Sequence, residues 1–136
     1  MKLLIDTNVI LDACLSRAPW HEAAEKIILA CAEEKILGCV TASSVTDIYY
    51  VLHKELRNVH QAKQAVLKIL TLLDVLDVTG GDCVKAFDLP MSDYEDALLA
   101  CCGKRHKVDW IATRNPKHFE GSPVKTISQD ALLKRL

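Results

Sequence analysis

Short, largely apolar runs alternate along the chain with longer segments in which apolar residues recur at helical spacing. The short runs predict buried strands at residues 2–5, 38–41, 109–112 and 124–127. A further strand over 74–78 is expected to be weaker, because two aspartates interrupt it. Runs this short and apolar are typical of parallel strands that are buried on both faces.

Segments with helical periodicity fill the intervals between these strands. In one of them, Ala24, Ile27, Ile28 and Cys31 recur at helical spacing. Helices are expected at 9–15, 20–34, from Ser43 or Ser44 to Leu56, and at 60–73, 82–87, 92–106 and 128–135. The alternation predicts an α/β fold, a three-layer α/β/α arrangement around a parallel sheet. We expect residues 1–136 to form one domain, since no repeat or linker divides them.

The composition limits the classes of protein to which the chain can belong. Of its 136 residues, 17 are basic and 18 acidic, which gives a formal net charge of -1, and half are apolar. This excludes a disordered tail protein, because such chains are poor in apolar residues. It also excludes a generic nucleic-acid coat protein, because that class carries a large positive excess. A polyanion would therefore have to be held by local basic patches or through a metal ion.

The six cysteines do not form a recognisable disulfide or metal-binding pattern. No C-x-x-C pair with metal spacing occurs among Cys14, Cys31, Cys39, Cys83, Cys101 and Cys102. Residues 1–6 do not read as a signal peptide, and no apolar run is long enough to span a membrane. We therefore expect reduced, mostly buried cysteines in a cytoplasmic protein, with a redox or zinc role as the alternative.

Polar side chains follow the predicted strands or begin the helices beside them. Ligands of parallel α/β sheets bind beyond the carboxyl ends of the strands, so residues there are candidates for a functional site. These candidates are Asp6, Thr7 and Asn8 after the first strand, Asp47 in the first turn of the helix after the second, Asp93, Glu95 and Asp96 at the start of the helix before the fourth, and Thr113, Arg114 and Asn115 after the fourth. Separate segments are thus expected to bring acidic and amide oxygens to one end of the sheet.

Carboxylates that converge in this way need protons or a cation. At about 4 Å and an effective dielectric constant near 20, each pair repels by on the order of 4 kcal/mol. Hard oxygen donors suit Mg²⁺ or Mn²⁺ rather than zinc, which prefers nitrogen and sulfur. A divalent ion with open positions binds a phosphate oxygen and lowers the pKa of bound water. The pattern therefore predicts metal-assisted hydrolysis of phosphodiesters, which also explains how a net-negative protein could act on a polyanion.

Each of these residues also has a purely structural explanation. Short polar side chains form turns and helix caps, and acidic residues complement the positive start of a helix. The alternatives are an Asx turn at Asp6, a turn at Asn115 before Pro116, capping boxes that pair Ser44 with Asp47 and Ser92 with Glu95, and complementation of the helix dipole by Asp93 and Asp96. The joint placement of the residues, rather than any one of them, favours a functional site.

Four segments resemble the motifs of the PIN-domain ribonucleases. They are residues 4–10 (LIDTNVI), 40–50 (VTASSVTDIYY), 93–98 (DYEDAL) and 111–115 (IATRN), and residues 124–136 resemble the closing strand and helix of the family. The resemblance covers essentially the whole chain in the family's order. It implies a five-stranded parallel sheet ordered 3-2-1-4-5, a Mg²⁺ or Mn²⁺ site and cleavage of single-stranded RNA. Many members are the toxins of bacterial toxin–antitoxin pairs and many are homodimers, so an antitoxin partner and a homodimer are also implied.

The resemblance implies roles for individual acidic residues. Asp6 matches the first metal ligand of the family, and Asp96 matches the third acidic residue. Asp47 matches the second, which is glutamate in most members and is here one methylene shorter. Asn115 stands where many members have a fourth acidic residue, and its amide supplies no charge. Asp93 lies three residues before Asp96, on the same helical face, and is a candidate substitute.

Neighbouring polar residues receive supporting roles in this hypothesis. Asp93 or Asp96 is a candidate to accept a proton from the attacking water. The residues expected to orient that water or a phosphate oxygen are Thr7, Asn8 and Thr113, and those expected to hold the RNA backbone are Arg114, Lys104 and Arg105. The alternative for the basic run at 104–107 is a solvated helix end that counters the negative pole of the helix dipole.

Three other classes of protein share part of this pattern. A PIN fold with a weak or inactive site, acting through protein or RNA contacts, is supported by Asn115 and the shortened Asp47. A receiver domain needs paired acids after the first strand, yet Thr7 and Asn8 follow Asp6 there. A haloacid-dehalogenase-type phosphatase needs a second aspartate where Asn8 stands. The residues thus favour a metal-dependent ribonuclease, with the binding module as the main alternative.

Overall fold

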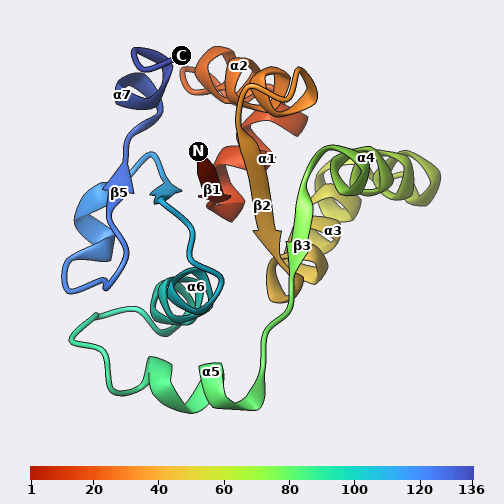
Figure 1. Ribbon diagram of the computed structural model, residues 1–136. Helices are drawn as coiled ribbons and strands as arrows, with labels where there is room; N and C mark the ends of the chain where they lie inside the picture. The colour runs from red at the N-terminus through yellow and green to blue at the C-terminus, as the bar shows by residue number, and fades with distance from the viewer.

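All five strands join one parallel sheet in the computed structural model, which describes residues 1–136. The strands lie in the order β3-β2-β1-β4-β5, and every neighbouring pair is parallel. Their bounds are β1 (Lys2–Ile5), β2 (Leu37–Thr41), β3 (Asp74–Leu76), β4 (Trp110–Ala112) and β5 (Thr126–Ile127). The predicted α/β class and the order 3-2-1-4-5 are confirmed (Figure 1).

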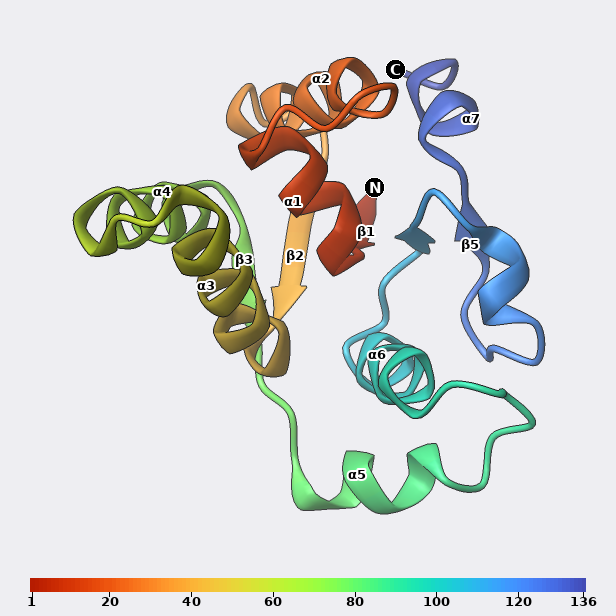
Figure 2. The same ribbon diagram turned by 180° about the vertical axis from the view of Figure 1, so that it is seen from behind.

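Helices cover both faces of the sheet because its central strand is buried on both. Leu3 and Ile5 of β1 belong to one hydrophobic cluster, whereas Leu4 belongs to another, as expected when successive side chains point to opposite faces. The first cluster is covered by α1 (Thr7–Cys14), α2 (His21–Ala32), α3 (Ala42–Leu56), α4 (Val59–Leu72) and α7 (Gln129–Leu133). The second is covered by α6 (Tyr94–Arg105) and the 3₁₀ helix η1 (Pro116–Phe119), and α5 (Gly80–Ala86) packs against α6. Figures 1 and 2 show α5 and α6 on one side of the sheet and α1 to α4 on the other.

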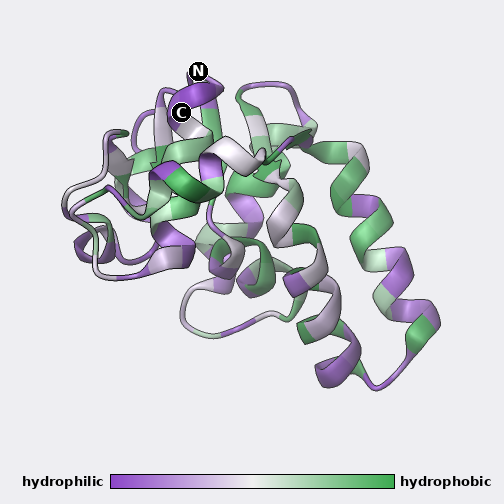
Figure 3. Ribbon diagram, turned by 90° about the horizontal axis from the view of Figure 1, so that it is seen from below, coloured by the Kyte–Doolittle hydropathy of each residue, from purple (hydrophilic) through white to green (hydrophobic).

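The helices carry hydrophobic and hydrophilic segments in alternation along their length, as Figure 3 shows. This amphipathic pattern places an apolar stripe against the sheet and leaves polar residues in solvent. No helix in the structure combines the length and the apolar character needed to cross a lipid bilayer.

Helices α3 and α6 begin one to three residues away from the starts predicted from the capping-box spacing in the sequence. Thr41, rather than a serine, is the N-cap of α3, and buried Ser44 lies with its Oγ 2.8 Å from Thr41 Oγ1. Asp93 is the N-cap of α6, and its side chain accepts a hydrogen bond from the backbone N–H of Asp96 at 3.0 Å. The capping boxes that pair Ser44 with Asp47 and Ser92 with Glu95 are therefore wrong. Asp47 also lies in the second turn of α3 rather than the first, where it is exposed.

The cysteines are free thiols, as the sequence predicts. All six are unpaired, and Cys31, Cys39 and Cys102 are buried in the two hydrophobic clusters. Burial raises the pKa of Cys31 and of Cys102 to about 11, so both stay protonated near neutral pH. The buried cysteines therefore behave as small apolar side chains.

Candidate active site

The carboxyl ends of β1 and β4 place two polar side chains in direct contact. The register pairs Ile5 with Ala112, so that Asp6 and Thr113 are the next residues on adjacent strands. The Thr113 hydroxyl donates a hydrogen bond of 2.9 Å to Asp6 Oδ2, and both residues are buried. The Asp6 backbone N–H also donates to the carbonyl of Ala112 at 3.0 Å. Asp6 is thus held in place from its main chain and from one carboxylate oxygen.

A cleft with an acidic lining opens beside Asp6. It consists of two pockets of about 480 and 580 Å³, which adjoin because Asp6, Asn8, Glu95 and Asp96 line both. The smaller pocket is completed by Trp20, Asp93, Thr113, Arg114, Asn115 and His118, and the larger by residues that include Thr7, Asp47, Tyr50 and Tyr94. We call the two pockets together the acidic cleft. The structure therefore brings Asp6, Asp47, Asp93, Asp96 and Asn115 to one place, although they come from four separate segments.

Asp6 and Asp96 lie in this cleft, and neither of them forms a salt bridge. Burial raises the pKa of Asp6, and the hydrogen bond from Thr113 offsets part of that rise. The pKa of Asp96 rises to about 6, chiefly through burial and then through repulsion by Asp6 and Asp93. The two carboxylates therefore destabilise each other's charged form, and the cleft favours a positive charge.

Asp47 faces the same cleft from α3. It lines the larger pocket together with Asp6 and Asp96 and is exposed to solvent. The structure holds no group of three or more His, Cys, Asp or Glu side chains arranged to hold a metal ion. The three aspartates thus share a pocket without forming a closed set of ligands.

His118 is a residue of the cleft that the sequence analysis does not single out. It lies on η1 and lines the smaller pocket, with its Nε2 3.2 Å from Asn115 Nδ2. It shares this pocket with Asp6 and Asp96, and a positive charge on its ring would lower the pKa of both carboxyls. The Asn115–Pro116 turn is the only sequence signal near it, because η1 is too short to show a periodic pattern.

Arg114 lines the cleft, but its guanidinium is directed toward other groups. Its Nε lies 3.5 Å from Oδ2 of Asp12, a fully buried residue of α1. Its Cζ lies 3.9 Å from the centre of the Trp20 ring. The structure therefore fixes Arg114 at the wall of the cleft.

The structure does not bring Lys104 and Arg105 to the cleft. They lie at the C-terminal end of α6, and Arg105 follows Asp96 by nine positions, which is about 13 Å along the helix axis. Arg105 donates two hydrogen bonds from Nε, 3.0 and 3.2 Å long, and one from Nη2, 2.9 Å long, to the Asp82 carboxylate. Arg105 thus forms an ion pair with Asp82 of α5.

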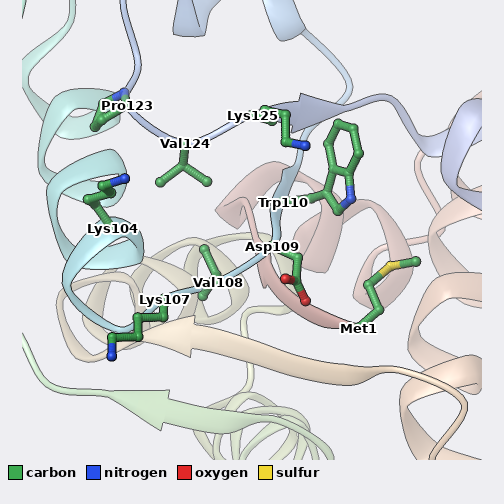
Figure 4. A pocket seen from close by; sticks show the side chains of 9 residues that line it. All are labelled: Met1, Lys104, Lys107, Val108, Asp109, Trp110, Pro123, Val124 and Lys125. Atoms are coloured by element: carbon green, nitrogen blue, oxygen red, sulfur yellow. The ribbon is translucent and has the colours of Figure 1, made fainter.

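Lys104 lines a different pocket, at the opposite edge of the sheet (Figure 4). This pocket has a volume of about 690 Å³, which exceeds that of either pocket of the acidic cleft taken alone, but it contains a single carboxylate, that of Asp109. Asp109 Oδ2 accepts a hydrogen bond of 2.7 Å from the backbone N–H of Lys2. The amine of Lys107 points away from the pocket in Figure 4. Size alone therefore does not identify the functional cavity, and the groups capable of acid, base or metal chemistry lie in the acidic cleft.

Comparisons with known proteins agree with the architecture. A family model described as PIN domain matches residues 2–117. No curated protein matches the sequence significantly. The chain is similar in structure to VapBC2 from Rickettsia felis bound to a DNA fragment from their promoter, at 15% identity and a TM-score of 0.72, over 94% of this chain and 98% of that one.

Two further structures show the same similarity. VapBC-1 from nontypeable Haemophilus influenzae is 17% identical with a TM-score of 0.68, over 96% of this chain and 99% of that chain. VapC20 from Mycobacterium tuberculosis, described as a sarcin-ricin loop cleaving toxin, is 13% identical with a TM-score of 0.64, over 80% and 86% of the two chains. At such identities the likeness establishes the fold.

Proposed function

The chain belongs to the PIN-domain family, and from this premise we propose that it is a divalent-metal-dependent endoribonuclease that hydrolyses phosphodiester bonds of single-stranded RNA. The observation that carries the proposal is the crowding of Asp6 and Asp96 in the acidic cleft. Neither forms a salt bridge, and the pKa of Asp96 is raised to about 6. Two carboxylates kept at such a cost in free energy suggest a site selected for a function rather than for stability.

The residues of the cleft fit Mg²⁺ or Mn²⁺ in their chemistry. Asp6 and Asp96, with Asp47 from α3, would supply hard carboxylate oxygens, which these ions prefer. A bound cation would also relieve the repulsion between Asp6 and Asp96. When bound, such an ion supplies a Lewis acid for the phosphate and lowers the pKa of a water molecule.

The other residues of the cleft would position the substrate and the attacking water. Thr113 holds Asp6 in one orientation through its 2.9 Å hydrogen bond. Asp93 uses Oδ1 to cap α6, which leaves Oδ2 free to accept a proton from water. The side chains suited to orient water or a phosphate oxygen are those of Thr7, Asn8, Asn115 and His118.

The RNA backbone would be held by His118 and by the Nη groups of Arg114, whose Nε faces Asp12, rather than by the basic run at the end of α6. Both line the pocket that contains Asp6 and Asp96. Arg105 is engaged with Asp82, and Lys104 lies at the opposite edge of the sheet. The proposal therefore assigns Lys104 and Arg105 no contact with the scissile phosphate.

We further propose that the protein is the toxin of a toxin–antitoxin pair, acting in the cytoplasm as a homodimer with all 136 residues in one domain. The family and the fold support this, since similar structures are the VapBC proteins of Rickettsia felis and Haemophilus influenzae. The partner would be an antitoxin that binds this chain. Light scattering on the purified chain, with and without the product of an adjacent gene, would measure both assemblies.

A catalytically weak PIN fold that acts through protein or RNA contacts is the alternative function. Asn115 favours it, because its amide supplies no charge where many family members have an acidic residue. The exposed position of Asp47 points the same way, since an exposed ligand binds an ion less firmly.

Incubation of the purified protein with single-stranded RNA and Mn²⁺, with and without EDTA, separates the two functions. The nuclease proposal predicts cleavage that EDTA abolishes and that added Mn²⁺ restores. An Asp96→Asn variant purified in the same way is the control for contaminating ribonucleases, and it is expected to be inactive. RNA binding without cleavage under all conditions would favour the binding module.

A further inference from the structure

Trp20 is the one hydrophobic side chain that lines the smaller pocket of the acidic cleft. It lies at the N-cap of α2 and keeps 40% of its surface exposed. The other lining residues are carboxylates, amides, a threonine, an arginine and a histidine. A partly exposed tryptophan is common on protein surfaces, and what distinguishes Trp20 is its position in the pocket that contains Asp6 and Asp96.

The structure holds the indole of Trp20 firmly in this position. The Arg114 guanidinium lies 3.9 Å from the ring centre and covers part of the ring. The Trp20 backbone N–H donates a hydrogen bond of 3.0 Å to the carbonyl of Arg17. The main chain of Trp20 is thus held by a hydrogen bond, and its ring is stabilised by a cation–π contact.

A buried carboxylate anchors Arg114 in turn. Asp12 is completely buried, and neither of its carboxylate oxygens makes a hydrogen bond. Arg114 Nε lies 3.5 Å from Oδ2, and Arg17 Nη1 lies 4.0 Å from Oδ1. Because removal of either charge would leave a buried aspartate with less compensation, Arg114 is held toward Asp12. Asp12, Arg114 and Trp20 therefore form a continuous chain of contacts from the core to the wall of the cleft.

We propose that Trp20, backed by Arg114, is a stacking platform for one unpaired nucleobase of the RNA next to the phosphate that is cleaved. A planar base has the shape and the apolar face to cover the exposed indole, and its edges tolerate the polar neighbours. Base–aromatic stacking is a common means of holding single-stranded nucleic acid. Purines are preferred to pyrimidines, because the larger ring system covers more of the indole. This inference rests on the proposed function, since it takes single-stranded RNA as the substrate.

The chain offers a direct spectroscopic test, because it has two tryptophans. Trp110 lies on β4 and lines the pocket at the opposite edge of the sheet, so that Trp110→Phe leaves Trp20 as the single reporter. Short oligo(A) added in EDTA, where no cleavage occurs, is expected to quench the fluorescence of Trp20 with saturation. Oligo(U) should quench less, and an abasic oligonucleotide of the same charge should not quench. Equal quenching by the abasic strand would overturn the stacking proposal.

Kinetics of Trp20 variants give a second readout. Trp20→Ala is expected to raise KM for single-stranded RNA about tenfold, within the range measured for loss of one base–aromatic stack. Trp20→Phe is expected to restore most of the affinity, and the preference for purines should weaken in Trp20→Ala. Thermal denaturation of each variant shows whether it folds, and the Trp110→Phe titration does not depend on that result.

The outcomes distinguish this inference from the function on which it rests. Cleavage by the unaltered protein with an unchanged KM and base preference in Trp20→Ala overturns the platform and leaves the nuclease in place. Absence of both RNA binding and cleavage in the unaltered protein overturns both.

Discussion

The two ends of helix α6 carry carboxylates in opposite situations. Beside its C-terminal end, Asp82 is buried, receives three hydrogen bonds from Arg105 and closes a capping box with Thr79. These partners hold the pKa of Asp82 below its ordinary value. At the N-terminal end, Asp96 shares the acidic cleft with Asp6, and its pKa rises to about 6.

The pKa values of Asp82 and Asp96 differ because only Asp82 has a positively charged partner. This difference distinguishes an acidic residue that stabilises the fold from one that serves a function. Asp82 is neutralised within the chain, so its charge stabilises the fold. Asp6 and Asp96 have no such partner, and their charges oppose folding until a cation or a proton arrives. We infer that the cation the cleft would bind comes from outside the chain.

Asp6→Asn is expected to produce the largest effect. It removes a charge from the cleft while keeping the shape of the side chain and an acceptor for Thr113. Metal-dependent cleavage of RNA should fall by at least about a hundredfold, which corresponds to several kcal/mol in the barrier. Circular dichroism should show an unchanged fold. Activity equal to that of the unaltered protein would refute the assignment of Asp6.

Asp82→Ala is the matched change at the other end of α6. It removes the capping box and the charged hydrogen bonds from Arg105, so the free energy of unfolding should fall by about 2–3 kcal/mol. Urea denaturation measures this change. The turnover number of the folded fraction should stay the same, because Asp82 lies outside the acidic cleft. A loss of turnover without a loss of stability would contradict the assignment of Asp82 to the stability of the fold and of Asp96 to function.

Asp96→Asn should stabilise the metal-free protein while it removes activity. The rise of the Asp96 pKa to about 6 means that its charge opposes folding at neutral pH. A displacement of two pKa units corresponds to about 3 kcal/mol. Partial exposure of Asp96 reduces this, and we expect a gain of about 1 kcal/mol in the free energy of unfolding. Denaturation in EDTA at pH 7.5 tests it, and a less stable variant would contradict the account.

The effect of pH gives the smallest expected signal. The folded protein protonates Asp96 near pH 6, whereas the unfolded chain does so near the ordinary value of 3.8. As the pH falls from 7 toward 4, the metal-free protein should gain stability relative to Asp96→Asn, until the difference disappears. Asp82 has the opposite effect on stability and at lower pH. Because its pKa is lowered in the folded protein, its charge stabilises the fold, and this stabilisation is lost only as the pH falls below about 4. Melting temperatures of the unaltered protein and of Asp96→Asn, measured across this pH range, test this prediction. A difference that stays constant with pH would show that the pKa of Asp96 is not raised in the folded protein.

Much of the fold follows from local patterns in the sequence. The short apolar runs locate all five strands, and the alternation with helices gives the α/β class. The resemblance to the PIN domain supplies the strand order, which periodicity alone does not contain. Helix starts are less predictable, because several capping residues stand side by side and tertiary contacts choose among them. Thus Thr41 is the N-cap of α3, and Ser44 is buried against it.

Some residues of the site are predictable from local sequence patterns, whereas others reach it only through the tertiary fold. Asp6 and Asp96 are predictable, because each lies next to a strand end or helix start that points to one edge of the sheet. His118 and Trp20 reach the cleft through a 3₁₀ helix and a turn, whose paths the sequence pattern does not reveal. Arg105 lies away from the cleft for a geometric reason, since the length of α6 carries it to Asp82.

Calorimetric titration with Mn²⁺ tests the central claim most directly, because it measures the captured cation without relying on activity. The unaltered protein and Asp130→Asn, a change at an exposed acid on α7, should bind Mn²⁺ with the same affinity. Asp6→Asn and Asp96→Asn should each bind it at least about tenfold more weakly, since each lacks one carboxylate of the cleft. Equal Mn²⁺ affinity in all four proteins would show that the acidic cleft is not the metal site.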